Sequence, residues 1–226
     1  EHAALDAANK GFVDGLAKKG FTEGKNITFD RQNAQADQSN LQNIANRFVN
    51  NKVDLICAIA TPSAQSVANA TKEIPIVGTA ITDYKSAKLV KDPAKPGTNV
   101  TGTTDMNPIK EQVELLQKVV PAAKNVGVIY CSSEVNSQIQ VEILKKEAAA
   151  KGLTIKEATV STVNDIQQAA HSLIGKVDAL YIPTDNIMAS AMPPLCKVTD
   201  EAKLAVICAE PGEVKAGGLI TLGIDY

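Results

Sequence analysis

The spacing of hydrophobic residues along the chain alternates between a helical and a strand-like pattern. The clearest helical stripe has apolar side chains at steps of three and four residues, namely Leu41, Ile44, Ala45, Phe48 and Val49. Short continuous apolar runs, such as 55–59, are instead typical of buried strands. Helices are expected at about 3–19, 41–49, 108–119 and 135–150, and strands at about 27–31, 53–60, 74–79, 99–103, 125–131, 154–160, 177–182, 204–209 and 218–223. This alternation predicts an α/β fold in which helices cross over between parallel strands.

The second half of the chain repeats the order of the first. The run Lys-Val-Asp-Leu-Ile at 52–56 matches Lys-Val-Asp-Ala-Leu at 176–180, and the helix end at 17–21 matches 149–153. Two similar α/β lobes explain the repeat, whereas a single sheet with a chance likeness is the alternative.

The same repeat leads to an expectation about the two ends. The second half opens with a strand at 125–130 before its helix, so the matching strand of the first half would precede residue 1. The chain stops at 224–226, where a covering helix would follow. We therefore expect an internal stretch of a longer mature protein, without the first strand and the C-terminal helix of the fold.

Composition and charge narrow the possible partners. Of the 226 residues, 23 are basic and 25 acidic, which gives a net charge of −2. No basic stripe is present, so nucleic acid is not expected as a partner. No apolar run approaches the roughly 18 to 20 residues of a membrane span.

Motifs for metal, cofactor or catalytic chemistry are missing from the sequence. The cysteines lie far apart without zinc-binding spacing, and inert free thiols are favoured over a disulfide: Cys57, Cys131, Cys196 and Cys208. Segment 97–103 has the glycine spacing of a phosphate-binding loop but not its lysine. We expect no metal, no cofactor and no enzymatic activity.

The end of the strand at 53–60 is a candidate anion site. Thr61 is expected as the N-cap of a helix whose first residue is Pro62. The N–H groups of Ser63 and Ala64 would then suit a carboxylate. The alternative interpretation is that Thr61 merely caps its helix.

Other strand ends carry acidic residues, which suit a cation rather than an anion. Asp83, Asp185 and Glu210 each follow a predicted strand and offer acceptors for an ammonium group. The alternative for Asp185 and Glu210 is that each caps the first turn of a helix. One anionic and one cationic subsite together would suit an amino acid zwitterion.

Several segments, in order and over essentially the whole chain, resemble ABC transporter substrate-binding proteins of the tryptophan/tyrosine-binding type. They are His2-Ala3-Ala4-Leu5-Asp6, Gly24-Lys25-Asn26-Ile27-Thr28-Phe29, Asn33-Ala34-Gln35-Ala36-Asp37, Ala58-Ile59-Ala60-Thr61-Pro62, Asn99-Val100-Thr101-Gly102, Gly127-Val128-Ile129-Tyr130, Pro183-Thr184-Asp185-Asn186 and Glu210-Pro211-Gly212. The order makes the likeness more specific than any single motif.

The resemblance implies a type I periplasmic-binding fold, with two Rossmann-like lobes of parallel sheets flanked by helices that close around a ligand by a hinge. Lobe one would be 1–103 plus 211–226 and lobe two 104–210, with hinge strands near 101–104 and 210–212. The implied ligand-binding residues are Thr61, Ser63, Thr82 and Asp83 from one lobe and Ser132, Ser133, Glu134, Asn136, Thr184, Asp185 and Glu210 from the other. A signal peptide, an extracytoplasmic or lipid-anchored location, a monomeric state and a membrane permease as partner are also implied.

Two departures from the family pattern affect the expected ligand preference. Cys131 stands where the family usually has Asn, and Asp83-Tyr84-Lys85 stands where it has Asp-Pro-Val. Our leading hypothesis is a receptor for an aromatic or branched amino acid. A sugar- or nucleoside-sensing effector domain of the same architecture is the main alternative, and a two-domain enzyme is the second.

Overall fold

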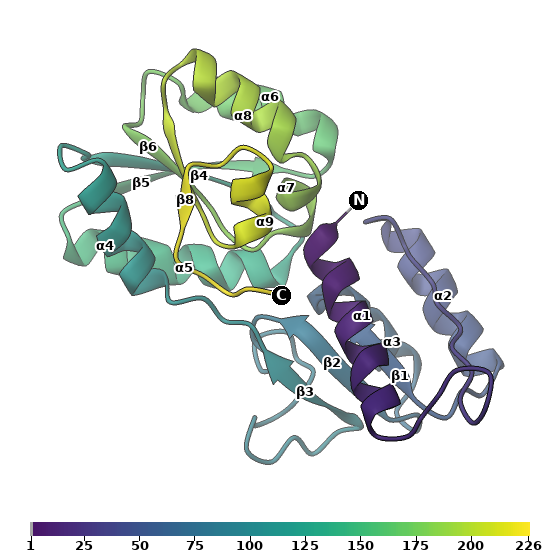
Figure 1. Ribbon diagram of the computed structural model, residues 1–226. Helices are drawn as coiled ribbons and strands as arrows, with labels where there is room; N and C mark the ends of the chain where they lie inside the picture. The colour runs from purple at the N-terminus through teal and green to yellow at the C-terminus, as the bar shows by residue number, and fades with distance from the viewer. Residues whose placement is uncertain (1) are drawn as a thin grey trace. The chain divides into compact units, whose positions relative to one another are not determined.

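The computed structural model describes residues 2–226 and divides into two compact units (Figure 1). Unit 1 contains the residues up to Asp105 together with Tyr226, and unit 2 contains Met106–Asp225. The chain therefore passes between the units twice. We call residues 105–107 and 222–226 the crossover segments.

Unit 1 is built on a three-stranded parallel sheet in the order β1-β2-β3. The strands are β1 (Ile56–Ile59), β2 (Ile76–Ile81) and β3 (Val100–Thr104). The register pairs Ile56 with Ile76 and Ile76 with Val100. All three side chains are buried, so this row forms part of the core of unit 1.

Three helices accompany this sheet in the described chain: α1 (Ala3–Lys18), α2 (Gln38–Asn50) and α3 (Thr61–Ala70). The Asp37 carboxylate caps α2 by accepting a hydrogen bond from the Asn40 N–H. Within the predicted stripe at 41–49, Ala45 is the fully buried member, and it joins Ala64 and Val67 of α3 in one core. Helices α2 and α3 therefore pack together on the sheet.

The strand expected at 27–31 is not formed, because this segment makes only an isolated bridge between Glu23 and Ile27. Its counterpart in the second half of the chain is β5 (Thr154–Val160), which pairs along its whole length with β4 (Asn125–Cys131). The described part of unit 1 has no strand equivalent to β4, and the segment does not pair with the open edge of β1. An extended segment without a partner leaves its backbone groups to water and does not become a strand.

Unit 2 contains a five-stranded parallel sheet in the order β5-β4-β6-β7-β8. The remaining strands are β6 (Ala179–Ile182), β7 (Ala205–Cys208) and β8 (Ile220–Thr221). Around the sheet lie α4 (Ile109–Val119), α5 (Val135–Ala150), the 3-10 turn η1 (Val163–Asp165), α6 (Ile166–Leu173), α7 (Asn186–Ser190), α8 (Met192–Glu201) and α9 (Pro211–Lys215). Figure 1 shows α4 and α5 on one face and α6 and α8 on the other.

Both faces of this sheet are buried, because neighbouring residues of its central strands enter different cores. In β4, Val128 packs with α4 and α5, while Ile129 packs with α6 and α8. In β6, Tyr181 packs in the core beneath α4 and α5, while Leu180 packs in the core beneath α6 and α8. Side chains alternate along a strand, so a strand covered on both faces reads as a continuous apolar run.

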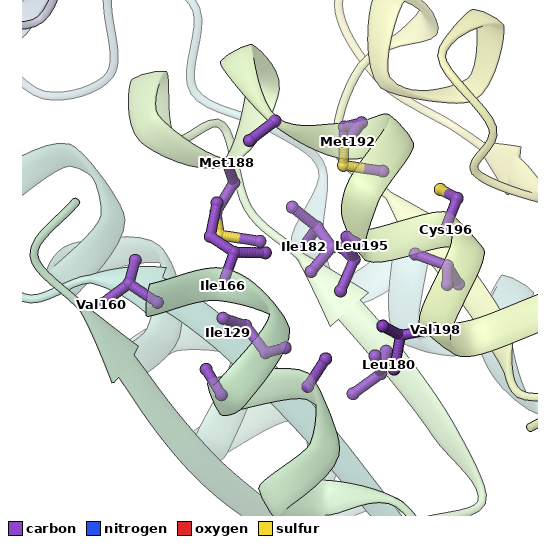
Figure 2. Packing of buried hydrophobic residues seen from close by; sticks show 14 of the residues in the cluster. Ile129, Val160, Ile166, Leu180, Ile182, Met188, Met192, Leu195, Cys196 and Val198 are labelled. Carbon is purple, nitrogen blue, oxygen red and sulfur yellow. The ribbon is translucent and has the colours of Figure 1, made fainter. Parts of the chain in front are cut away.

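The core beneath α6, α7 and α8 is the larger of the two in unit 2 (Figure 2). Ile129 and Ile182 from the sheet meet Ile166, Met188 and Leu195 from the helices, and all five are fully buried. Figure 2 shows these side chains converging between the strands and the helices. This core fixes β4 and β6, whose carboxyl ends carry most of the predicted site.

The structure corrects the expected boundaries of the lobes. Residues 211–225 belong to unit 2 rather than to lobe one, and the first boundary lies after Asp105 rather than after 103. The reason is that β8 continues the unit 2 sheet beside β7, where the Leu219 N–H donates to the Val206 carbonyl at 2.9 Å. The segment 210–212, expected as a hinge, therefore lies inside unit 2.

Across residues 2–226, no helix combines the length and the apolar character needed to cross a membrane.

Candidate functional site

Asp185 lies directly after β6, and both of its carboxylate oxygens accept hydrogen bonds. Oδ1 accepts from the Met188 N–H at 2.9 Å and caps α7. Oδ2 accepts from the Cys131 N–H at 2.6 Å and from the Ser137 hydroxyl at 2.7 Å. The residue is only 2% exposed; burial raises the pKa of its carboxyl, and the hydrogen bonds oppose that rise. Asp185 therefore ties the end of β4 and the start of α5 to β6.

Glu134 lies at the N-cap position of α5 and is also buried. Its Oε2 accepts from Asn136 Nδ2 at 2.8 Å and from the backbone and side-chain nitrogens of Asn186 at 3.2 and 2.6 Å. Its Oε1 accepts no hydrogen bond within residues 2–226, yet it is not a buried atom, so it reaches the surface of unit 2. Burial and then the charge of Asp185 raise the pKa of Glu134 to about 7.

Asn136 and Thr184 hold unused hydrogen-bonding capacity next to Glu134. Asn136 Nδ2 donates to the Thr184 carbonyl at 3.0 Å as well as to Glu134. Asn136 Oδ1 and the Thr184 hydroxyl are both buried, and neither has a partner within the described chain. A buried polar atom without a partner costs free energy, and a bound ligand is one way to meet that cost.

Ser132 and Ser133 occupy the exposed turn between β4 and α5. The Ser133 hydroxyl lies 3.2 Å from the Cys131 sulfur, and the Ser132 carbonyl accepts from Gln138 Nε2 at 2.6 Å. Strands β4 and β6 are neighbours in the sheet. The structure thus gathers most of the predicted unit 2 residues at one edge of that sheet: Ser132, Ser133, Glu134, Asn136, Thr184 and Asp185.

Glu210 follows β7, the next strand of the sheet, and caps α9. Its Oε1 accepts from the Glu213 N–H at 2.8 Å, and its Oε2 accepts from the Gly212 N–H at 2.6 Å. The Glu213 carboxylate is itself buried and accepts from the Ala209 N–H at 2.9 Å. Burial, followed by the charge of Glu210, raises the pKa of Glu213 well above its ordinary value.

In unit 1, helix α3 begins at Thr61, one residue earlier than expected, and Ala60 is its N-cap. Ala60 has φ +78°, a left-handed value that is uncommon for a residue with a side chain. The Ala64 N–H donates to the Ala60 carbonyl at 3.1 Å, so the unpaired N–H groups of the first turn belong to Thr61 and Ser63. The Thr61 hydroxyl is buried and has no partner within residues 2–226.

Thr82 and Asp83 follow β2 in unit 1. Asp83 Oδ1 accepts from the Ser86 N–H at 2.6 Å and fixes the turn after the strand. The Tyr226 hydroxyl donates to Asp105 Oδ2, and the Asp105 N–H donates to the Ile81 carbonyl of β2 at 3.2 Å. Burial raises the pKa of the Asp105 carboxyl, and the polar hydroxyls of Tyr226 and Thr82 oppose the rise. This arrangement connects the end of β2 to both crossover segments.

The sequence did not identify Ser137, Asn186 or Asp105 as members of the site. Ser137 and Asn186 hold the carboxylates of Asp185 and Glu134, respectively. Both stand within the polar stretches that follow β4 and β6, which is the signal that could have found them. No group of three His, Cys, Asp or Glu residues in the described chain is arranged to hold a metal ion.

Comparison with known proteins places this geometry in a family. The model of the ABC transporter substrate-binding protein family matches residues 1–226. A tyrosine-binding protein of Clostridioides difficile is 50% identical over all 226 residues, and the chain spans 66% of that relative's length.

Two solved structures resemble the chain over its whole length. One is an ABC domain from Streptococcus pneumoniae in complex with L-Trp, with 40% identity and a TM-score of 0.95. The other is a conserved domain protein from Vibrio cholerae, with 42% identity and a TM-score of 0.98. The chain covers 76% of each. The fold is that of the type I periplasmic-binding proteins, and the chain belongs to the family of ABC transporter substrate-binding proteins.

Proposed function

We propose that this chain is the solute-binding part of an ABC importer and that its ligand is an aromatic or branched amino acid. Family membership supports the transport role, and the similarity to a tyrosine-binding protein and to a domain bound to L-Trp supports an amino acid. On this proposal the protein acts outside the cytoplasm as a monomer, delivers its ligand to a membrane permease and catalyses no reaction. The similar proteins favour this role over a sugar- or nucleoside-sensing effector domain.

The first turn of α3 is the proposed site for the ligand's carboxylate. The N–H groups of Thr61 and Ser63 lack helical partners, and the positive end of the helix dipole favours an anion there. The buried Thr61 hydroxyl is a third donor without an acceptor. A carboxylate would accept from all three groups.

Glu134 is the proposed partner of the ligand's ammonium group, and this is the observation on which the function depends most. The carboxylates of Asp185 and Glu210 are fully engaged in capping and in holding neighbouring strands. Among the three strand-end acids of unit 2, Glu134 alone keeps an unbonded oxygen that reaches the surface. We therefore assign the ammonium to Glu134, and to Asp185 and Glu210 the role of shaping the site.

A thermal-shift screen against the twenty amino acids tests the function directly. A ligand that binds only the native state raises the melting temperature, and we expect L-Tyr or L-Trp to give the largest shift. Glu134→Gln should lower the affinity at least about tenfold, because it removes a charge-assisted hydrogen bond worth roughly 1.5 to 3 kcal/mol.

The matched control is Glu142→Gln. Glu142 lies on the same helix but is exposed, where it pairs with Lys145. The control should bind like the unmodified chain. Equal affinities of the two variants would overturn the role of Glu134, and a lack of response to every amino acid would overturn the proposed function itself.

A further inference from the structure

Three buried side-chain amides form a chain of hydrogen bonds through unit 2 that the ligand-binding residues do not explain. Gln112 on α4 and Gln140 on α5 are 0% exposed, and Asn107 in the first crossover segment is also buried. Burying an amide costs roughly 1 to 3 kcal/mol for each group left unpaired. Apolar side chains would fill the same space without that risk, so the amides point to a role beyond packing.

Gln140 holds the turn that carries the proposed ammonium site. Its Nε2 donates to the Asn136 carbonyl at 2.9 Å and to the Thr184 carbonyl at 3.3 Å. Its Oε1 accepts from the Thr184 N–H at 3.2 Å. Asn136 in turn bonds Glu134, so any shift of Glu134 on binding a cation reaches Gln140 through one residue.

Gln112 holds the crossover segments. Its Nε2 faces three acceptors: the Leu222 carbonyl at 2.9 Å, the Ala209 carbonyl at 3.4 Å and Asn107 Oδ1 at 3.4 Å. An amide nitrogen carries two hydrogens, so the three oxygens compete for two donors. Its Oε1 accepts from the Tyr181 hydroxyl at 2.5 Å, which fixes the orientation of the amide. The Gln112 amide can therefore switch its hydrogen bond between Asn107 in the first crossover segment and Leu222 in the second while its side chain stays in the same position.

Asn107 joins the two glutamines. Its Nδ2 lies 3.5 Å from Gln140 Oε1, and its Oδ1 accepts from Gln112. The second crossover segment passes very close to this point, because a Cβ placed on Gly223 would lie 1.8 Å from the Ala209 carbonyl oxygen and 2.9 Å from Asn107 Oδ1. The network is thus in contact with both crossover segments.

We propose that Gln140 is a positioning residue that transmits occupancy of the ammonium site, through Asn107 and Gln112, to the two crossover segments. This inference rests on the proposed function. On this view, a cation bound at Glu134 tightens the turn at 184 and so changes the hydrogen bonds that Gln140 makes with Asn136 and Thr184. Gln140 passes this change to Asn107, and Asn107 passes it to Gln112, which then changes its hydrogen bond to the Leu222 carbonyl. The amides remain in the core because they have alternative partners of similar strength.

Hydrogen exchange, followed by mass spectrometry with and without saturating L-Tyr or L-Trp, tests the proposal. In the unmodified chain the ligand should slow exchange both at 184–188 and at the crossover segments. Gln140→Met keeps the volume but removes the amide. It should retain the ligand-induced protection at 186–188, where the N–H groups of Asn186 and Met188 bond Glu134 and Asp185, while losing about fivefold or more of the protection at 222–225. Gln117→Met is the control, since Gln117 lies on α4 and its side-chain amide bonds the Lys151 carbonyl rather than a member of the network.

A second variant and a ligand-free comparison keep the test decisive. Asn107→Ala removes the link between the glutamines without changing a helix, and should reproduce the effect if Gln140→Met fails to fold. Without ligand, either variant should speed exchange at 222–225, whereas Gln117→Met should not, and this arm holds even if no amino acid binds. Unchanged exchange at the crossover segments in both variants would overturn the proposal, and binding of L-Tyr in those same samples would leave the proposed function intact.

Discussion

At the scale of single residues, Thr61 is the member of the proposed carboxylate site whose unpaired hydroxyl affects stability as well as binding. Its hydroxyl is buried without a partner, which costs the ligand-free protein about 1 to 3 kcal/mol. Thr61→Val keeps the shape and removes the unpaired group. We expect the free energy of unfolding of this variant, measured with denaturant, to rise by about 1 kcal/mol. We also expect the variant to bind L-Tyr more weakly. A variant that loses stability and keeps its affinity would contradict the assignment.

Glu134 gives the protein a pH dependence whose sign follows from its environment. Its pKa is raised in the folded chain to about 7 from an ordinary value near 4.5. Between these values the folded state binds more protons than the unfolded state, so the free energy of unfolding falls as pH rises from about 4.5 to about 7 and is level above. The contribution is present in full below about 4.5.

Glu134→Gln should therefore flatten this part of the stability profile, by an amount on the order of 3 kcal/mol. Urea unfolding at a series of pH values measures it. Asp185 and Glu213 also have raised pKa values and contribute in the same direction, so some slope should remain in the variant. Identical slopes for the variant and the unmodified chain would show that the carboxyl of Glu134 is ionised throughout this range.

Asp185 illustrates a residue for which the sequence left two interpretations open. The pattern of an acidic residue after a strand fits a cap and a ligand partner equally well, because the sequence does not show which groups its oxygens contact in the fold. Both accept hydrogen bonds from the protein, so Asp185→Ala should cost about 2 to 4 kcal/mol of stability, measured by chemical denaturation. Loss of affinity without loss of stability would instead make Asp185 a ligand partner.

At the scale of elements, the turn from β1 into α3 has an unusual backbone. Ala60 has φ +78° and ψ 152°, a conformation that is easily reached only by glycine and costs other residues about 1 to 3 kcal/mol. The turn starts α3 two residues after the last residue of β1. Ala60→Gly should raise the melting temperature, or at least leave it unchanged, and a clear decrease would show that the conformation is not strained.

The predicted strands that pair within the described chain are formed, and the predicted strand at 27–31, which does not pair there, is not formed. The run at 125–131 becomes β4 because both faces and both edges of that strand are covered. The segment 27–31 was also predicted as a strand, but within residues 2–226 it makes an isolated bridge and no strand pairing. The local hydrophobic pattern shows that a segment can form a strand, and pairing with a neighbouring strand decides whether the strand forms.

At the scale of the whole molecule, the internal repeat predicted two α/β units, and each unit contains a parallel sheet with helices. The division between the units was not predictable in the same way. Residues 211–225 return to the sheet of unit 2 through β8, a strand of two residues whose pairing no periodicity reveals. The buried amides of Gln112 and Gln140 were equally invisible, because a lone glutamine in a helix is usually a surface residue.

The central claim is that one ligand is recognised through its carboxylate and through its ammonium group. Isothermal titration calorimetry with L-tyrosine, with tyramine and with 3-(4-hydroxyphenyl)propionate tests it, because each analogue keeps the aromatic ring and lacks one charged end. We predict that L-tyrosine binds and that each analogue binds at least about a hundredfold more weakly, which corresponds to roughly 2.7 kcal/mol. If either analogue binds as tightly as the amino acid, the corresponding half of the site is misassigned and the account fails.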